Sequence, residues 1–322
     1  MRAAVLTTPG ESPTHDEHPD PTPGPGCTLV RVTAAPIVPL DLLCASGTSY
    51  FGRPATPYVP GVQGVGVVER GTDRIAPGIP VWFATPAGMA PGDGSMRERA
   101  CAAEHDVVPL PPGSDQVLVA ALGLSAVAAW MALTWRGELA AGERVVVLGA
   151  GGTVGQAAVQ LARLAGAGQV IAVARAAEAL ERAVHLGADA AVALHPIGTL
   201  TDRIAQRCDG PVDLVLDPLF GDPAAAALRT LRPHGRLVNL GSSAAETAPI
   251  ESAVLRGRSL RVLGYTNAGL TPEQRRDALT VVAEHAAAGR LTVTHQPVPL
   301  AEAATAWTRP GRVVLIPDPP SQ

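Results

Sequence analysis

The chain has 322 residues and a formal charge of −4, and all 25 of its basic residues are arginine. The absence of lysine excludes Schiff-base enzymes of the aldolase or pyridoxal-phosphate type, phosphate-loop nucleotidases, and kinases that hold ATP with a strand lysine. A hydrophobic content of 47% with 17% charged residues is typical of a globular protein of about two domains. No basic stripe is present, so we expect no nucleic-acid partner.

Targeting signals and cysteine motifs are also missing. The first residues, Met1–Leu6, are too short and too soon polar for a signal peptide. No window approaches the roughly 18 uninterrupted apolar residues of a membrane helix. The four cysteines stand singly, without the CxxC spacing of a zinc site or redox dithiol. We therefore expect a soluble, cytoplasmic protein with reduced thiols and no membrane partner.

The first third of the chain predicts a small β-rich domain over residues 1–116. Residues 12–26 are crowded with proline, which excludes a helix. Short apolar alternations at 28–32, 64–68 and 79–83 lie between glycines and prolines and predict strands.

Longer apolar segments follow and predict a second domain over residues 117–265. Predicted helices cover 117–136 (broken near Gly123), 156–164, 176–186 and 224–231, and predicted strands cover 144–148, 170–174, 213–217 and 236–240. Continuous apolar strands that alternate with helices indicate a parallel, doubly wound sheet. The remaining residues, 266–322, predict a helix at 272–288 and two short strands that pack back on the first domain.

The strongest motif lies between the strand at 144–148 and the following helix. It has the form A-x-G-x-x-G, in which glycines let the backbone approach a pyrophosphate and the helix amino terminus supplies N–H groups. The predicted cofactor contacts in this loop are Ala150, Gly151, Gly152, Thr153, Val154 and Gly155. A ligand-free Gly-rich turn is the alternative interpretation, and the strand–turn–helix–strand context favours dinucleotide binding.

The end of the next strand indicates which dinucleotide is bound. An NAD site places Asp or Glu there to hold the ribose 2′-hydroxyl, whereas this chain has Arg175. A guanidinium can pair with a 2′-phosphate and stack on adenine, so we favour NADP(H). The alternative is that Arg175 is an ordinary surface arginine.

The order of these parts resembles the medium-chain dehydrogenase/reductase superfamily, and most of all its zinc-independent quinone oxidoreductase branch, which includes zeta-crystallin. The resemblance covers nearly the whole chain, and the segments that carry it are 34–41, 60–68, 123–126, 147–156, 235–242 and 311–315. It implies a GroES-like catalytic domain around a Rossmann domain, with the active site in the cleft. It also implies a homodimer formed through the edge strand at 259–263.

The resemblance implies further cofactor contacts outside the loop. Gly241 and Ser242 correspond to the loop beside the nicotinamide, Ser125 begins the helix that enters the cofactor domain, and Tyr265 begins the return to the catalytic domain. Ser125 could instead be satisfied only within its helix. Asp217 resembles a family position that follows a strand, and a role in forming the turn there is sufficient to explain it.

The departures from the zinc alcohol dehydrogenases concern the metal site. Val38, Val62 and Gln63 occupy the positions of a Cys, a His and a Glu in those enzymes, and aliphatic side chains cannot ligate zinc. The four-cysteine loop is absent as well, so we expect no metal. Asp41 is interpreted as a structural residue that caps or pairs, with a general-base role as the alternative.

Tyr50 is the candidate catalytic residue, because it matches a tyrosine that related enoyl reductases use as a hydrogen-bond or proton donor. It could equally fill the mouth of the cleft. The resulting hypothesis is an NADPH-dependent reductase that transfers hydride to a quinone or an α,β-unsaturated carbonyl. The alternatives are an NADPH-binding structural or regulatory protein with vestigial catalysis and, less favoured, a zinc alcohol dehydrogenase.

Overall fold

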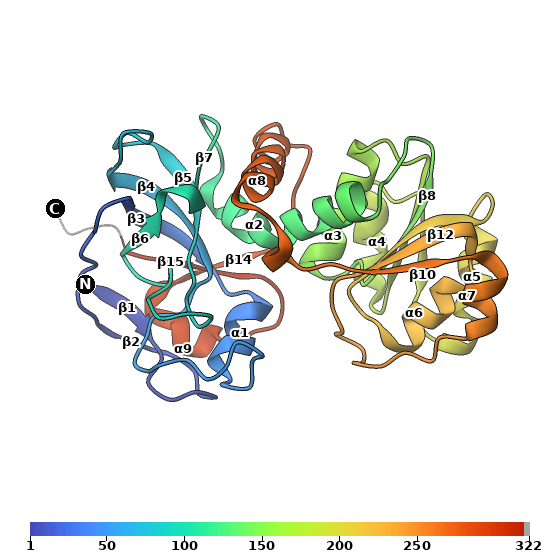
Figure 1. The fold of residues 1–322 in the computed structure, drawn as a ribbon, viewed down its shortest axis with the longest axis horizontal. Helices are drawn as coiled ribbons and strands as arrows, with labels where there is room; N and C mark the ends of the chain where they lie inside the picture. Colours follow the sequence, from blue (N-terminus) through green and yellow to red (C-terminus); the bar gives the residue numbers. More distant parts are fainter. Residues whose placement is uncertain (319–322) are drawn as a thin grey trace. The chain divides into compact units, whose positions relative to one another are not determined.

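A computed structural model describes residues 1–318, which form two compact units (Figure 1). The catalytic unit comprises Met1–Gly123, Pro272–Gly289 and the chain from Val293 onwards. The cofactor unit comprises Leu124–Thr271 and Arg290–Thr292. Each unit has its own sheet and its own buried core.

The catalytic unit is built around a seven-stranded sheet in the order β14-β15-β3-β4-β5-β7, with β6 also paired to β3. Its strands are β3 (Cys27–Pro36), β4 (Gln63–Arg70), β5 (Pro80–Ala84), β6 (Arg99–Ala103), β7 (Val107–Pro109), β14 (Gln296–Pro299) and β15 (Val313–Ile316). β3 alternates buried and half-buried residues as a strand with one core face does. β15 pairs antiparallel with β3, with Leu315 opposite Ala35, so the segment that contains β15 belongs to this unit.

Smaller elements complete the catalytic unit. β1 (Arg2–Val5) and β2 (Thr14–Glu17) form a separate antiparallel pair, and the helices are α1 (Pro39–Ala45), α8 (Pro272–Ala287) and α9 (Ala303–Ala306). The core is largely aliphatic, with Phe83 and Met96 fully buried within it. This agrees with the low aromatic content of the chain.

The cofactor unit contains a six-stranded sheet in the order β10-β9-β8-β11-β12-β13, with every neighbouring pair parallel. Its strands are β8 (Arg144–Leu148), β9 (Gln169–Ala174), β10 (Ala190–Ala193), β11 (Val212–Asp217), β12 (Leu231–Asn239) and β13 (Arg261–Gly264). Its further helices are α3 (Thr153–Leu164), α4 (Ala177–His185), α5 (Leu200–Arg207), α6 (Gly221–Leu228) and α7 (Ser252–Arg258). β9 and β11 are buried along their whole length and are mostly apolar, with continuous apolar runs at 170–174 and 214–216. The predicted α/β fold with a parallel doubly wound sheet is confirmed.

The helix α2 (Gln116–Met131) is broken where the sequence predicts. Gly123 has φ 32° and ψ −133°, a conformation outside the helical region. A Cβ at Gly123 would overlap Gln63, with only 2.7 Å to its Cδ. Gln63 is fully buried and accepts a hydrogen bond from Trp82 Nε1 at 3.0 Å. The break in α2 therefore makes room for a buried amide.

One expectation about apolar segments is wrong. Gln116–Arg136 has the length and mean hydropathy, 2.1, of a helix that could cross a membrane. Its apolar residues are interrupted only by Gly, Ser and Thr, which do not lower the hydropathy enough to exclude a span. Within the structure 67% of that window is buried, as in the core helix of a folded domain.

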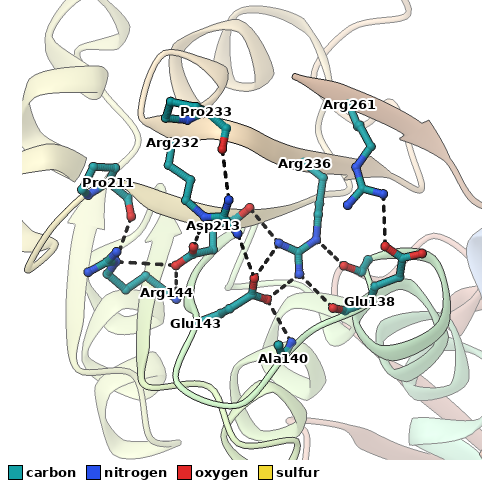
Figure 2. A network of polar contacts seen from close by, with 11 residues as sticks. Glu138, Ala140, Glu143, Arg144, Pro211, Asp213, Arg232, Pro233, Arg236 and Arg261 are labelled. Atoms are coloured by element: carbon teal, nitrogen blue, oxygen red, sulfur yellow. Dashed lines mark hydrogen bonds and ion pairs between the residues drawn. The ribbon is translucent and has the colours of Figure 1, made fainter. Parts of the chain in front are cut away.

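A network of arginines and carboxylates joins the amino ends of β8, β11 and β12 (Figure 2). Glu143 accepts hydrogen bonds from both Arg236 Nη atoms, at 2.9 Å from Nη1, and from Arg232 Nη2 at 3.4 Å. Asp213 accepts from the Arg144 backbone N–H at 2.8 Å and from Arg232 Nε. Arg236 is only 3% exposed, so the Glu143 carboxylate compensates a buried cation.

Candidate functional site

The predicted cofactor loop connects β8 to α3 in the cofactor unit. The Ala150 N–H donates to the Val173 carbonyl of β9 at 2.9 Å, which fixes the loop to the sheet. Gly152 is the residue before the helix and has extended backbone, and no side chain caps α3. The first N–H groups of the helix therefore face outward at the positive end of its dipole, as in an anion site.

The glycines of this loop serve two different purposes. A Cβ at Gly155 would overlap the Gly149 carbonyl oxygen and lie 2.6 Å from the Ala150 Cα, so glycine lets α3 approach the loop. A Cβ at Gly152 would meet no protein atom closer than 3.6 Å. Because nothing in the protein requires glycine at 152, its missing side chain leaves space for a ligand. The loop thus fits a bound pyrophosphate.

Gly149 belongs to the same arrangement, although the sequence motif did not single it out. It has φ 65°, in the left-handed region. A Cβ there would lie 3.1 Å from both the Pro218 Cγ and the Leu219 Cδ2. The turn after β11 therefore packs directly against the cofactor loop. A glycine immediately after a buried strand was the available signal.

Arg175 lies just beyond the carboxyl end of β9, as the sequence indicates. Its side chain is exposed, and within residues 1–318 it forms no ion pair with an acid. Its neighbours Ala174 and Ala176 bring no charge of either sign. The guanidinium is therefore available to a ligand at this edge of the sheet.

Asp217 and Asn239 connect the loops at the carboxyl edge. Asp217 is fully buried, and its Oδ1 accepts the backbone N–H groups of Leu219 and Phe220, each at 2.9 Å. Burial raises the pKa of its carboxyl, although these hydrogen bonds oppose that change. Asn239 Nδ2 donates to Asp217 Oδ2 at 3.0 Å and to the Gly241 carbonyl at 2.8 Å. The turn role expected of Asp217 is confirmed, and the linking role of Asn239 was missed.

The other predicted cofactor contacts form two groups within the cofactor unit. Gly241 follows β12, and a Cβ there would lie 3.0 Å from the Pro218 carbonyl oxygen. The Ser242 hydroxyl donates to Glu246. These two residues therefore share the carboxyl edge with the Gly-rich loop.

Tyr265 is linked by hydrogen bonds to the part of α2 that follows the break at Gly123. Its hydroxyl donates to Asn267 Oδ1 at 2.7 Å, and Asn267 Nδ2 donates to the Leu124 carbonyl at 3.0 Å. Ser125, 9% exposed, follows directly in the chain. Burial raises the pKa of the Tyr265 phenol, so it stays protonated at neutral pH. Tyr265 and Ser125 are thus parts of one local assembly.

Tyr50 lies in the catalytic unit and is 77% exposed. Its ring centre is 4.3 Å from that of Phe51, with the planes tilted by 39°. A cavity of about 400 Å³ in the same unit is lined by Phe51 and by Arg53, Tyr58 and Met89 among others. The phenol of Tyr50 is therefore accessible to a ligand, and an apolar surface lies next to it.

Two of the positions compared with zinc ligands, Val38 and Val62, bind a buried carboxylate through their backbone N–H groups. Asp41 is 2% exposed and accepts the Val38 N–H at Oδ2, 2.9 Å, and the Val62 N–H at Oδ1, 2.8 Å. Burial raises the pKa of Asp41 to about 6, although the backbone donors and Arg312 oppose the shift. Asp41 thus caps α1 and ties it to the start of β4, in agreement with its expected structural role.

Arg312 completes this buried site. Its Nη1 donates to the Ile37 carbonyl at 2.7 Å, and burial lowers the pKa of its guanidinium to about 10 while Asp41 opposes the change. Over residues 1–318, no three His, Cys, Asp or Glu side chains are grouped so that they could hold a metal ion.

Two family models match the chain. The model described as an alcohol dehydrogenase GroES-like domain matches residues 24–112, and the model described as a zinc-binding dehydrogenase matches residues 153–284. A solved structure of the quinone oxidoreductase from Thermus thermophilus, also described in complex with NADPH, is 30% identical. It has a TM-score of 0.79 and aligns over 98% of this chain and 100% of that one. The chain belongs to the medium-chain dehydrogenase/reductase superfamily, in its quinone oxidoreductase branch.

Two curated relatives extend this result. The human synaptic vesicle membrane protein VAT-1 homolog is 31% identical over 247 residues, 74% of this chain and 59% of the relative. The rat quinone oxidoreductase is 31% identical over 226 residues, 69% of this chain and 66% of the relative. The chain therefore spans less than two thirds of the length of these curated relatives. The zinc-binding description belongs to a model that does not include Val38, Val62 or Gln63.

Proposed function

We propose that this medium-chain dehydrogenase/reductase is an NADPH-dependent oxidoreductase that transfers hydride to a quinone or an α,β-unsaturated carbonyl without zinc. The observation that carries the proposal is the glycine loop at the carboxyl edge of the cofactor unit. It is followed by Arg175, which forms no ion pair within residues 1–318, where an NAD site has an acid. The Thermus thermophilus quinone oxidoreductase, described in complex with NADPH, supports the same cofactor.

The cofactor would be held mainly by backbone groups. The first N–H groups of α3, from Thr153 onwards, would bind the pyrophosphate, and Gly152 would let it approach. Arg175 would pair with the 2′-phosphate. When bound, NADPH would supply the hydride. Gly241 and Ser242 would border the nicotinamide.

Ser125 and Tyr265 would contribute to the same side of the cofactor. Their hydrogen-bonded surroundings, through Asn267 and Leu124, hold them in fixed positions. We therefore place them as binding residues that limit where the nicotinamide lies.

Tyr50 would act on the substrate. Its exposed phenol would donate a hydrogen bond to the oxygen that becomes negatively charged, or a proton to the α-carbon of an enone. A quinone accepts hydride with little acid catalysis, so it would depend less on Tyr50. Phe51 and the neighbouring cavity offer an apolar surface for either acceptor.

Purified protein should oxidise NADPH with members of a quinone panel or an enone panel. Tyr50→Phe should lower kcat with an enone about a hundredfold and change the rate with a quinone less than about threefold. The quinone rate is the internal control, because Tyr58, the other tyrosine near Tyr50, belongs to the lining of the neighbouring cavity. Binding of NADPH without turnover in either panel would overturn the proposed activity.

A second candidate is an NADPH-binding structural or regulatory protein with vestigial catalysis. Gln63 favours it, because its buried amide supports Trp82 and the break in α2. The VAT-1 homolog also favours it, because its name describes a vesicle membrane protein and no reaction. Protection against heat by NADPH, combined with inert kinetics in both panels, would select this function. Stoichiometric bound zinc would instead select an alcohol dehydrogenase.

We also propose a cytoplasmic homodimer. The strand β13 lies at the edge of the six-stranded sheet, and Val262 on it is 40% exposed. Pairing of two such edges would satisfy their open backbone groups. The mass of the protein in solution, measured by light scattering, tests this assembly, and a monomer at micromolar concentration would contradict it.

A further inference from the structure

A second cavity of about 310 Å³ lies in the cofactor unit at the amino ends of β11 and β12. This is the opposite edge of the sheet from the Gly-rich loop, because parallel strands all begin at one edge and end at the other. The cavity is lined by Thr201, Ala205, Cys208, Gly210, Pro211, Val212, Arg229, Thr230, Leu231, Arg232, Pro233 and Arg258. Figure 2 shows three of them, Pro211, Arg232 and Pro233, beside the charged network.

The charged residues that line this cavity are all positive. It contains three arginines and no aspartate or glutamate. Arg258 Nη1 donates to the carbonyls of Arg229, 2.7 Å, and Leu231, 2.8 Å, and within residues 1–318 Arg258 forms no ion pair. Its positive charge is therefore not compensated by a protein carboxylate.

The other two arginines form ion pairs with carboxylates. Arg229 binds Glu251, which is itself exposed, and Arg232 binds Asp213 and Glu143. These acids orient the guanidiniums but do not belong to the lining. A planar guanidinium has five N–H donors, so each arginine keeps donors for a second anionic partner.

The remaining lining is mostly apolar. Ala205, Pro211, Leu231 and Pro233 contribute carbon surface. The Thr230 hydroxyl already donates to the Ala227 carbonyl at 2.7 Å. The donors available to a ligand are therefore the guanidiniums, and the rest of the cavity suits an apolar body.

We propose that this cavity is a binding site for a small phosphorylated molecule with an apolar body. The phosphate lies between Arg258 and Arg229, and the apolar part packs on Ala205 and the prolines. Arginine and phosphate form charge-assisted, often bidentate hydrogen bonds. The site does not depend on the proposed oxidoreductase activity, because none of its lining residues belongs to the cofactor loop or to the Tyr50 region.

The test uses phenyl phosphate as the probe, titrated calorimetrically into the full chain with and without saturating NADPH. Arg258→Gln should weaken binding at least tenfold. Arg256→Gln is the matched control on the same helix and should change the affinity less than twofold. Within residues 1–318 the Arg256 side chain bonds only Ser252, and Arg256 lies outside the lining. Benzyl alcohol, the neutral analogue, should not bind here.

A second pair of variants tests the site in case Arg258→Gln fails to fold. Ala205 is exposed, so Ala205→Glu places a negative charge at the cavity without removing a buried contact, whereas Ala205→Gln adds similar bulk without charge. Ala205→Glu should abolish binding and Ala205→Gln should retain it. If NADPH displaces the probe, and neither Arg258→Gln nor Ala205→Glu weakens its binding, the probe binds at the cofactor loop and the proposal is overturned. The absence of any binding overturns it as well.

Discussion

The two units of the molecule build their sites in different ways. In the cofactor unit, the carboxyl edge of the sheet presents backbone N–H groups, and glycines at 149, 152 and 155 create the space around them. In the catalytic unit, Asp41 collects the N–H groups of Val38 and Val62, and no metal-binding group of side chains forms within residues 1–318. The site in the cofactor unit consists of backbone groups, so glycines specify it. A site made of side chains depends on where an exposed group such as Tyr50 is held.

The largest effect is expected at the glycine that the protein itself requires. Gly155→Ala places a Cβ against the backbone of Gly149 and Ala150, so it should lower the free energy of unfolding by about 2–4 kcal/mol. Gly152→Ala is the matched control, because its Cβ meets no atom closer than 3.6 Å. It should leave stability unchanged and weaken cofactor binding about tenfold or more. Urea unfolding and cofactor titration measure both, and equal losses of stability would contradict the division of roles.

A smaller effect is expected at the amino edge of the same sheet. Glu143→Gln removes the carboxylate that compensates the buried Arg236, and should cost about 1–3 kcal/mol of unfolding free energy. Glu138→Gln should cost less, because Glu138 and its partner Arg261 are exposed. Neither variant should change the affinity for the cofactor, because the proposed cofactor site lies at the other edge. A loss of cofactor affinity in Glu143→Gln would show that the two edges are coupled.

The pH dependence of this network has a definite sign. Burial is the largest single influence on Glu143 and raises its pKa, but the hydrogen bonds from Arg236 and the Ala140 N–H, together with the charge of Arg236, leave the pKa below its usual 4.5. Its contribution to stability is therefore present above pH 4.5 and is lost as the pH falls through the lowered pKa. Urea unfolding between pH 3 and pH 6 should show this loss in the wild type and a weaker loss in Glu143→Gln.

Asp41 should behave in the opposite way. Burial raises its pKa to about 6 from a usual 3.8, so the folded state binds the proton more tightly than the unfolded state does. Its contribution favours folding below about pH 4 and is lost as the pH rises through 6. Asp41→Asn should remove this component from the pH dependence of unfolding. If the wild type and the variant show the same pH dependence from pH 4 to pH 7, Asp41 does not titrate in this range.

Much of the fold could be predicted from the sequence because its strongest patterns are local. The strand β8 and the break of α2 at Gly123 lie where apolar runs and a glycine placed them. The predicted helix at 224–231 is displaced, because α6 occupies Gly221–Leu228 and Leu231 already begins β12. An alanine-rich segment carries no capping or turn residue that marks where the helix begins or ends, so the sequence does not define these helix boundaries. The short strand β10 was missed, since four small residues give no period.

The candidate site was only partly predictable. The Gly-rich loop follows from spacing, whereas Asn239 and Gly149 act through contacts with the turn after β11, which is distant in the chain. The arginine-lined cavity likewise brings together Thr201, Arg229 and Arg258, and no sequence spacing indicates that they meet. Tyr50 is identified by resemblance alone, because its exposed position carries no packing signal.

The central claim is that this chain binds NADPH through Arg175. Its most direct test is the affinity for NADPH and for NADH, measured by titration on the wild type and on Arg175→Asp, with Arg207→Asp as an exposed arginine control on α5. The account predicts that Arg175→Asp weakens NADPH binding at least tenfold, changes NADH binding less than twofold, and that Arg207→Asp changes neither. An unchanged preference for NADPH in Arg175→Asp would contradict it.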